Sequence, residues 1–190
     1  MPEGDTRRIR LIFVGCVAVL VVLFDTGLLR TSSANTLRAL ELQAHEKLVQ
    51  LIRDGNKLTS FTTDGCSGGL SSTWRVTSDL FPEFAKAHRT SPPWENCCVT
   101  HDRAYHAAGG ATEAEQSYAL RLAADETLKE CISRTSPDRS ADLQARYGLT
   151  DQQVRAAYRI IANAMYEAVR VGGFPCSGLE WRWGYGYPQC

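Results

Sequence analysis

The sequence predicts an all-α protein whose helices are held together by disulfide bonds and which begins with a hydrophobic segment. Apolar residues recur at three- and four-residue spacing in several long segments, the pattern of helices that bury one face. Apart from Cys16 in the hydrophobic segment, the chain has an even number of cysteines, which is typical of an exported domain with disulfides. They are Cys66, Cys97, Cys98, Cys131, Cys176 and Cys190.

The first 34 residues are expected to act as a signal peptide or as a membrane anchor. Arginines precede an apolar run at residues 11–24, and the small residues Ser32-Ser33-Ala34 suit cleavage. If the segment stays attached, the run continued to Leu29 nearly reaches the length that spans a bilayer, although Asp25 lies within it. Both alternatives place one domain, residues 35–190, outside the cytoplasm, either secreted or periplasmic or anchored by the first segment.

The charge balance argues against a polyanionic partner. Lys and Arg number 21 and Asp and Glu number 21, so the formal net charge is zero. A domain that binds nucleic acid carries a basic surface, and none is predicted here. We therefore expect no nucleic-acid partner, and no electrostatic docking on anionic lipid.

Three segments outside the middle of the chain are expected to be helices. Residues 35–54 carry Leu37, Leu40, Ala44, Leu48 and Leu51 at helical spacing, with Gly55 as a stop. Ser136-Pro137 opens a short helix that runs to about Tyr147. Thr150 and Gln153 have the spacing of a capping box for a helix that continues to Val171.

The stretch Cys97-Cys98-Val99-Thr100-His101-Asp102-Arg103-Ala104-Tyr105-His106 carries the most chemistry. Adjacent cysteines cannot conveniently bond to each other, so each must reach a different segment. On a helix, Cys97, His101 and Tyr105 share one face, while Asp102 points about 100° away. A clamped helix that presents an imidazole and a carboxylate in different directions is more typical of an active site than of packing.

The next helix offers a partner for His101. Gly109-Gly110 ends the first helix, and Thr112-x-x-Glu115 is the pattern of a capping box. In the apolar stripe of Tyr118, Leu122, Asp125, Leu128 and Ile132, a carboxylate occupies a position where a hydrophobe is expected. Burial of Asp125 is costly without partners. Helices joined by a short turn pack antiparallel, so Asp125 is expected to face His101 and fix its tautomer.

Residues 62–69, Thr-Thr-Asp-Gly-Cys-Ser-Gly-Gly, form a loop by composition. Glycines let backbone carbonyls turn towards a cation, and calcium takes hard oxygen ligands. On its own this motif is weak and favours a plain turn over a cation site. Beside the His101-Asp102 pair it becomes a candidate calcium site.

The stretch 97–106 resembles the C-C-x-x-H-D-x-C-Y signature of the secreted phospholipase A2 family, with Ala104 in place of the third cysteine. The resemblance covers roughly residues 60–132 and is nearest to prokaryotic members. It implies an all-α, disulfide-stapled core with long loops, in which two antiparallel helices carry a His/Asp dyad. It also implies calcium-dependent hydrolysis of the sn-2 ester of glycerophospholipids in a membrane surface or micelle. His101 would be the general base, Asp125 would orient it, and Tyr105 would donate a hydrogen bond to Asp125.

The resemblance also implies metal ligands and a disulfide pairing. Asp102 would be the carboxylate ligand of Ca²⁺, with the Gly65 carbonyl as the first backbone ligand. Ser67 and Gly69 are further loop candidates, and Asp64 resembles the extra loop carboxylate of prokaryotic members. The implied disulfides are Cys66–Cys98 and Cys97–Cys131, which leaves Cys176–Cys190. A further family disulfide would join positions 104 and 124, and both are alanine here.

Two parts of the chain depart from the family. Residues 70–94 are an insertion, in which Trp74, Leu80, Phe81 and Phe84 form either an apolar rim or lid over the site or a satellite core. The tail, residues 172–190, is rich in glycine and aromatic residues. It suits either a membrane interface or a disulfide-closed cap on the core.

Two other functional classes remain as alternatives. The first is a catalytically silent lipid- or protein-binding module on the same scaffold. The second is a structural zinc site, for which the candidate ligands are Cys66, Cys97, Cys98, His101 and His106. His45 and His88 have no partner pattern and are expected to face solvent.

Overall fold

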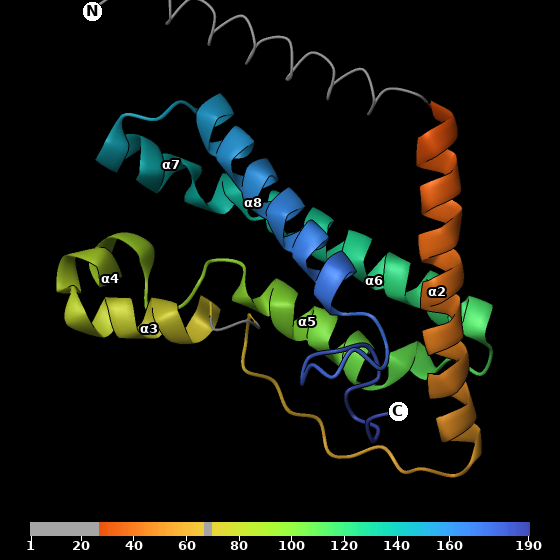
Figure 1. The fold of residues 1–190 in the computed structure, drawn as a ribbon. Helices are drawn as coiled ribbons and strands as arrows, with labels where there is room; N and C mark the ends of the chain where they lie inside the picture. The colour runs from red at the N-terminus through yellow and green to blue at the C-terminus, as the bar shows by residue number, and fades with distance from the viewer. Residues whose placement is uncertain (1–26, 67–69) are drawn as a thin grey trace, which may run out of the picture. The chain divides into compact units, whose positions relative to one another are not determined.

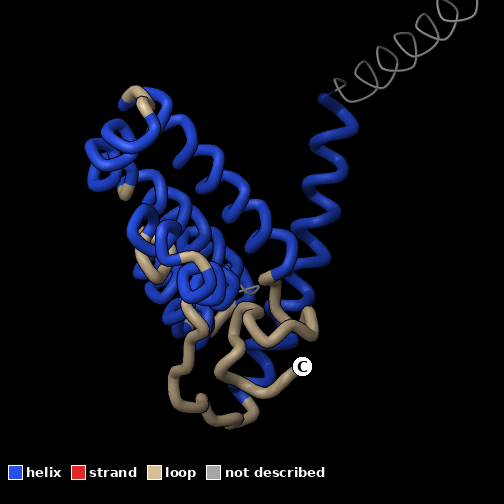
Figure 2. Tube along the Cα trace, turned by 90° about the vertical axis from the view of Figure 1, so that its left-hand side faces the viewer, coloured by secondary structure: helices blue, strands red, loops and turns tan. Residues whose placement is uncertain are grey.

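A computed structural model describes residues 27–66 and 70–190 of the chain, and for residues 27–34 it describes the helix without the side chains. Within these ranges the protein consists of helices and loops, with no strand (Figures 1 and 2). The helices are α2 (Gly27–Arg53), α3 (Leu70–Leu80), α4 (Pro82–His88), α5 (Glu95–His106), α6 (Ala114–Arg134), α7 (Ser136–Tyr147) and α8 (Asp151–Gly172), with a 3₁₀ turn η1 (Ala108–Gly110). The prediction of an all-α protein is confirmed for this part of the chain.

The apolar run at residues 11–24, on which the targeting prediction depends, lies outside the described residues. Within residues 27–66 and 70–190, no helix combines the length and the apolar character needed to cross a bilayer. The chain divides after Leu40, and residues 41–190 form the compact unit that holds the candidate site.

Helices α5 and α6 form an antiparallel pair (Figure 1). A disulfide joins Cys97 near the start of α5 to Cys131 near the end of α6, and His101 meets Asp125 further along the same pair of helices. Turn η1 closes the pair, and Gly109 within it adopts a positive φ of 62°. A side chain at this residue would also press on Leu120, 3.1 Å from the position of its Cβ. The Gly109-Gly110 stop is therefore observed where the sequence predicts it.

Helix α8 packs along α6 and completes the main core (Figure 1). Leu128 and Ile132 of α6 meet Val154 and Ala162 of α8, and the half-cystines of two disulfides join the same cluster. The capping box at Thr150 is present, because its hydroxyl accepts the Gln153 N–H and the Gln153 side chain accepts the Thr150 N–H.

The predicted capping box at Thr112 is wrong. Helix α6 begins at Ala114, with Glu113 as its N-cap, and no side chain of that residue caps the helix. Instead, Gln116 Oε1 accepts the backbone N–H of Thr112 at 3.0 Å. The chain is still extended at Ala111 and Glu113, so the helix starts one residue later than the pattern suggests.

The insertion contains α3 and α4, which the sequence did not predict. The Trp74 ring lies 5.3 Å from that of Phe84 and 5.9 Å from that of Trp94, which makes a satellite core. Leu80 and Phe81 are exposed instead, at 67% and 60%. None of the four apolar residues of the predicted lid lines the cavity beside His101.

The three disulfides are Cys66–Cys98, Cys97–Cys131 and Cys176–Cys190. This is the pairing that the family resemblance implies. Because none of these cysteines is free to bind a metal, the zinc hypothesis is wrong. Three disulfides are typical of an extracytoplasmic protein.

The tail after α8 packs across the end of α5. The backbone N–H groups of Gly184 and Gly186 donate to the carbonyl oxygens of Tyr105, at 2.7 Å, and His106, at 3.0 Å. The Trp183 indole is completely buried against Tyr105 and Leu48. Of the two predicted alternatives, this arrangement corresponds to the cap on the core.

Candidate functional site

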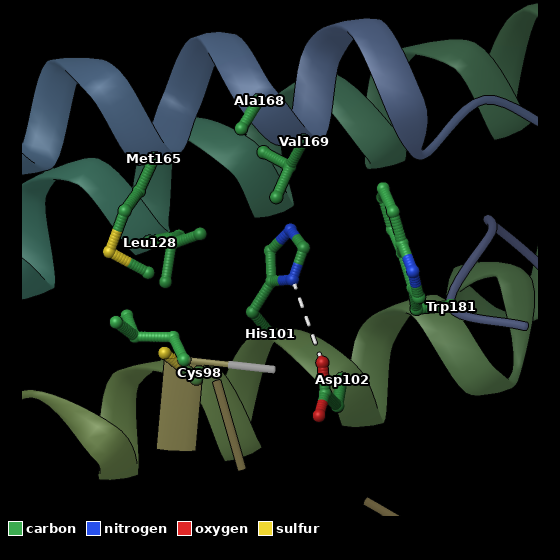
Figure 3. A pocket seen from close by; sticks show the side chains of 9 residues that line it. Cys98, His101, Asp102, Leu128, Met165, Ala168, Val169 and Trp181 are labelled. Atoms are coloured by element: carbon green, nitrogen blue, oxygen red, sulfur yellow. Dashed lines mark ion pairs between the residues drawn. The ribbon is translucent and has the colours of Figure 1, made fainter. Parts of the chain in front are cut away.

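His101 lies on the inner face of α5, where it is buried and bonded to the neighbouring helix. Its Nε2–H donates to Asp125 Oδ1 at 2.8 Å. This bond assigns the proton to Nε2, so Nδ1 carries the lone pair. Nδ1 lies 4.0 Å from Asp102 Oδ1, on the side of the ring that faces Asp102 (Figure 3).

Asp125 is completely buried and is held by three donors from two neighbouring helices, α5 and α8. Oδ1 accepts hydrogen bonds from His101 and from the Tyr105 hydroxyl, the latter at 2.7 Å, while Oδ2 accepts from Arg170 Nη1 at 3.0 Å. Burial alone would raise the pKa of Asp125. The hydrogen bonds from His101 and Tyr105 and the charge of Arg121 outweigh burial and lower that pKa. Asp125 is therefore ionised.

The surroundings of His101 favour its charged form. Burial by itself lowers the pKa of this imidazole. The carboxylates of Asp102 and Asp125 outweigh burial and raise the pKa above its usual value. A ring that gains a proton here would be stabilised by carboxylates on both sides.

Behind the His101–Asp125 pair lies a buried ionic network that the sequence analysis missed. Arg121 of α6 is fully buried and pairs with Glu41 of α2, and its Nε donates to the Tyr105 hydroxyl at 3.1 Å. Arg170 of α8 bridges Glu41, at 2.8 Å, and Asp125. The four-residue spacing of Arg121 and Asp125 is a local signal for part of the network. Glu41 and Arg170 are too far away in sequence to give one.

Asp102 points to the glycine-rich loop, as predicted. Its Oδ2 accepts a hydrogen bond from Thr63 Oγ1 at 2.5 Å. A polar hollow lies at this place, lined by Thr62, Thr63, Asp64, Asp102, Glu180, Trp181 and Tyr185. The hydroxyl of Tyr185 donates to the Thr62 carbonyl at 2.6 Å. Burial, together with the negative charges of Asp102 and Asp64, raises the Tyr185 pKa.

Of the predicted metal ligands, Asp64 and Asp102 line this hollow together, and Gly65 adjoins it in sequence. Gly65 has a φ of 86°, and a Cβ there would lie 2.6 Å from Ser71 Oγ, so the loop requires glycine. Ser67 and Gly69 lie outside the described residues.

The donors in the polar hollow are hard oxygens, which fit calcium rather than a softer metal. Among the residues that the structure describes, no group of three His, Cys, Asp or Glu side chains is arranged to hold a metal ion. Calcium binding here therefore needs backbone carbonyl oxygens of the loop besides the carboxylates.

An apolar cavity of about 320 Å³ opens beside His101 (Figure 3). It is lined by Leu70, Cys98, His101, Asp102, Leu128, Met165, Ala168, Val169 and Trp181. Trp181 lines both this cavity and the polar hollow. Its ring approaches α8 at Gly172, where a Cβ would lie 2.3 Å from the indole, so only glycine leaves room for it.

The other histidines are not where the sequence suggests. The prediction that His45 faces solvent is wrong, because the ring is fully buried and its Nδ1 lies 2.7 Å from Ser117 Oγ. His88 is half-buried and stacks on Tyr147. His106 is buried against the rings of Phe61 and Tyr185.

No protein-family model matches the chain, and neither a curated protein nor a solved structure matches it. The function is therefore inferred from the residues and their geometry.

Proposed function

We propose that this protein is a calcium-dependent hydrolase of the sn-2 ester of glycerophospholipids, as its resemblance to secreted phospholipase A2 implies. One observation carries the proposal. His101, held in a buried group with Asp125 and Tyr105, lines the apolar cavity, and the neighbouring Asp102 lines both that cavity and the polar hollow that contains Asp64. The oriented imidazole of His101 would then act as a base beside an apolar cavity that can hold an alkyl chain and beside oxygen atoms that suit calcium.

The dyad supports activation of a water molecule. His101 would take a proton from water on Nδ1, and the water oxygen would attack the ester carbonyl carbon. Asp125 would stabilise the imidazolium through the Nε2–H bond that it already accepts. His101 would then give the proton to the departing glycerol oxygen, which releases a fatty acid and a lysophospholipid and restores the neutral ring.

The surrounding residues would bind and orient the substrate. The apolar walls, among them Leu128, Met165 and Val169, suit an acyl chain. Thr63 holds Asp102 in place in the polar hollow. Calcium bound by Asp102 and loop carbonyl oxygens would supply positive charge for the phosphate and for the developing oxyanion.

The test is hydrolysis of phosphatidylcholine in mixed micelles by the purified protein. We expect EGTA to abolish fatty-acid release and added calcium to restore it. Replacing His101→Gln should lower kcat by at least about a hundredfold without unfolding the protein, because the base is removed while the scaffold stays. His88→Gln is the matched control, since this imidazole lies outside the site and stacks on Tyr147.

Activity that is indifferent to chelation would contradict the calcium mechanism. A folded parent protein that binds phospholipid but hydrolyses none would favour the silent binding module instead.

A further inference from the structure

The carboxylate of Asp125 is held at both of its oxygens. His101 and Tyr105 donate to Oδ1, whereas Arg170 Nη1 donates to Oδ2 at 3.0 Å. Arg121 Nε lies 3.9 Å from Oδ2, beyond hydrogen-bond distance. Because the terminal torsion of an aspartate is soft, the donors at Oδ1 alone would let the carboxylate turn about its Cβ–Cγ bond. Arg170 supplies the one hydrogen bond at the second oxygen among the described residues.

Arg170 is itself fixed in place. It lies in the last turn of α8, and its Nη2 donates to both oxygens of Glu41, at 3.2 and 2.8 Å. Arg121 Nη2 donates to the carbonyl oxygens of Val169, at 2.7 Å, and Arg170, at 2.9 Å, which ties the end of α8 to α6. A planar guanidinium held at two sides gives a fixed direction to the bond that it donates to Asp125.

The charges of the network balance. Arg121 and Arg170 face two carboxylates, those of Glu41 and Asp125. Glu41 pairs with both arginines, so neither guanidinium neutralises Asp125 alone. Asp125 can therefore remain the counter-ion of His101 while Arg170 holds its orientation.

We infer that Arg170 is a positioning residue, which keeps the Asp125 carboxylate in line with the Nε2–H of His101 and is itself held by Glu41. As a role in ester hydrolysis this inference rests on the proposed function. The orientation of the His101–Asp125 bond does not, because it can be observed without turnover.

The experiment compares Arg170→Gln and Arg170→Lys with the parent protein. In Arg170→Gln we expect kcat on phosphatidylcholine micelles to fall by roughly ten- to a hundredfold with little change in KM, because a displaced dyad affects the transition state more than substrate binding. Arg170→Lys keeps a cation without the planar fork, so its kcat should lie between those of the parent and Arg170→Gln. Arg155→Gln is the matched control, since it breaks an exposed ion pair with Asp151 on the same helix.

A second measurement distinguishes this inference from the proposed function. The hydrogen-bonded Nε2 proton of His101 is expected to give a downfield proton NMR resonance in the parent and in Arg155→Gln. The resonance should broaden or disappear in Arg170→Gln and shift in Arg170→Lys. If the parent hydrolyses nothing, the proposed function fails, and this resonance still decides whether Arg170 orients the pair.

The inference is overturned if Arg170→Gln keeps the parent kcat and resonance, or if KM alone rises. Should Arg170→Gln fail to fold, Arg170→Lys decides. A lowered kcat with a shifted resonance supports the positioning role, and parent-like values of both overturn it.

Discussion

Asp125 shows how a single residue can predict a site from sequence. A carboxylate in an apolar helical stripe is costly to bury without partners, and the structure provides those partners at both of its oxygens. The helix pattern predicted His101 as one partner, and the family resemblance implied Tyr105 as another. It did not predict Arg170 or Glu41, because 129 residues separate the two and no local pattern connects them.

His45 gives a pH-dependent prediction at the same scale. Its ring is buried and, chiefly because of that burial, its pKa is lowered. Below the usual histidine pKa of about 6.5 the unfolded chain binds a proton that the folded protein does not, so this residue makes the folded state less stable as pH falls. Between pH 7.5 and 5.5, the parent should lose about 1 kcal/mol of unfolding free energy relative to His45→Gln.

Urea unfolding at the two pH values measures this difference. Glutamine is the appropriate replacement because it retains a hydrogen-bonding group for Ser117. Equal pH dependence in the two proteins would show that His45 is not held neutral.

At the scale of elements, local start signals predicted α7 and α8 but gave no indication of α3 and α4. Helices α7 and α8 begin at the predicted proline and capping box. Helix α3 is rich in serine and threonine, which have low helix propensity. It depends instead on contacts with the distant Arg89, whose carbonyl oxygen accepts hydrogen bonds from Trp74 Nε1 and Ser78 Oγ. No pattern within the segment reveals such contacts.

The antiparallel register of α5 and α6 predicts where another disulfide can form. Cys97 faces Cys131, and moving seven residues along each helix brings Ala104 opposite Ala124. Both alanines pack against the same apolar cluster. The double variant Ala104→Cys/Ala124→Cys should therefore oxidise to a fourth disulfide. Because it closes a loop of about 20 residues, it should stabilise the protein by about 2–3 kcal/mol.

Thiol titration before and after reduction, followed by thermal unfolding, measures the outcome. Two thiols that stay free under oxidising conditions would contradict the register.

At the scale of residues 41–190, the tail completes the candidate site, whose proposed catalytic groups His101, Tyr105 and Asp125 lie on α5 and α6. It provides Trp181 to the apolar cavity and Glu180 and Tyr185 to the polar hollow. The buried indole of Trp183 donates from Nε1 to Ser117 Oγ at 2.9 Å, which fixes the tail to α6. The Cys176–Cys190 disulfide lies nearer the surface, and Cys190 is exposed.

We expect the indole to hold the tail more firmly than the disulfide does. The double variant Cys176→Ser/Cys190→Ser should lose about 2–3 kcal/mol of unfolding free energy but keep most of the proposed phospholipid hydrolysis. Trp183→Ala should lose about 3–5 kcal/mol and most of the hydrolysis, because a large cavity opens beneath the tail. Urea unfolding and the micelle assay measure both effects. A folded double-serine variant without activity would show that the disulfide is the more important attachment.

The absence of a side chain at Gly172 affects the width of the apolar cavity, because it sets where the Trp181 ring can lie. The missing side chain is what allows the outer edge of the Trp181 indole to approach the end of α8. Even one methyl group at residue 172 would displace the indole from the helix. Trp181 lines both the apolar cavity and the polar hollow, so the shape of both would change. The acyl chains that the proposed site would admit are therefore expected to depend on an atom that residue 172 does not have.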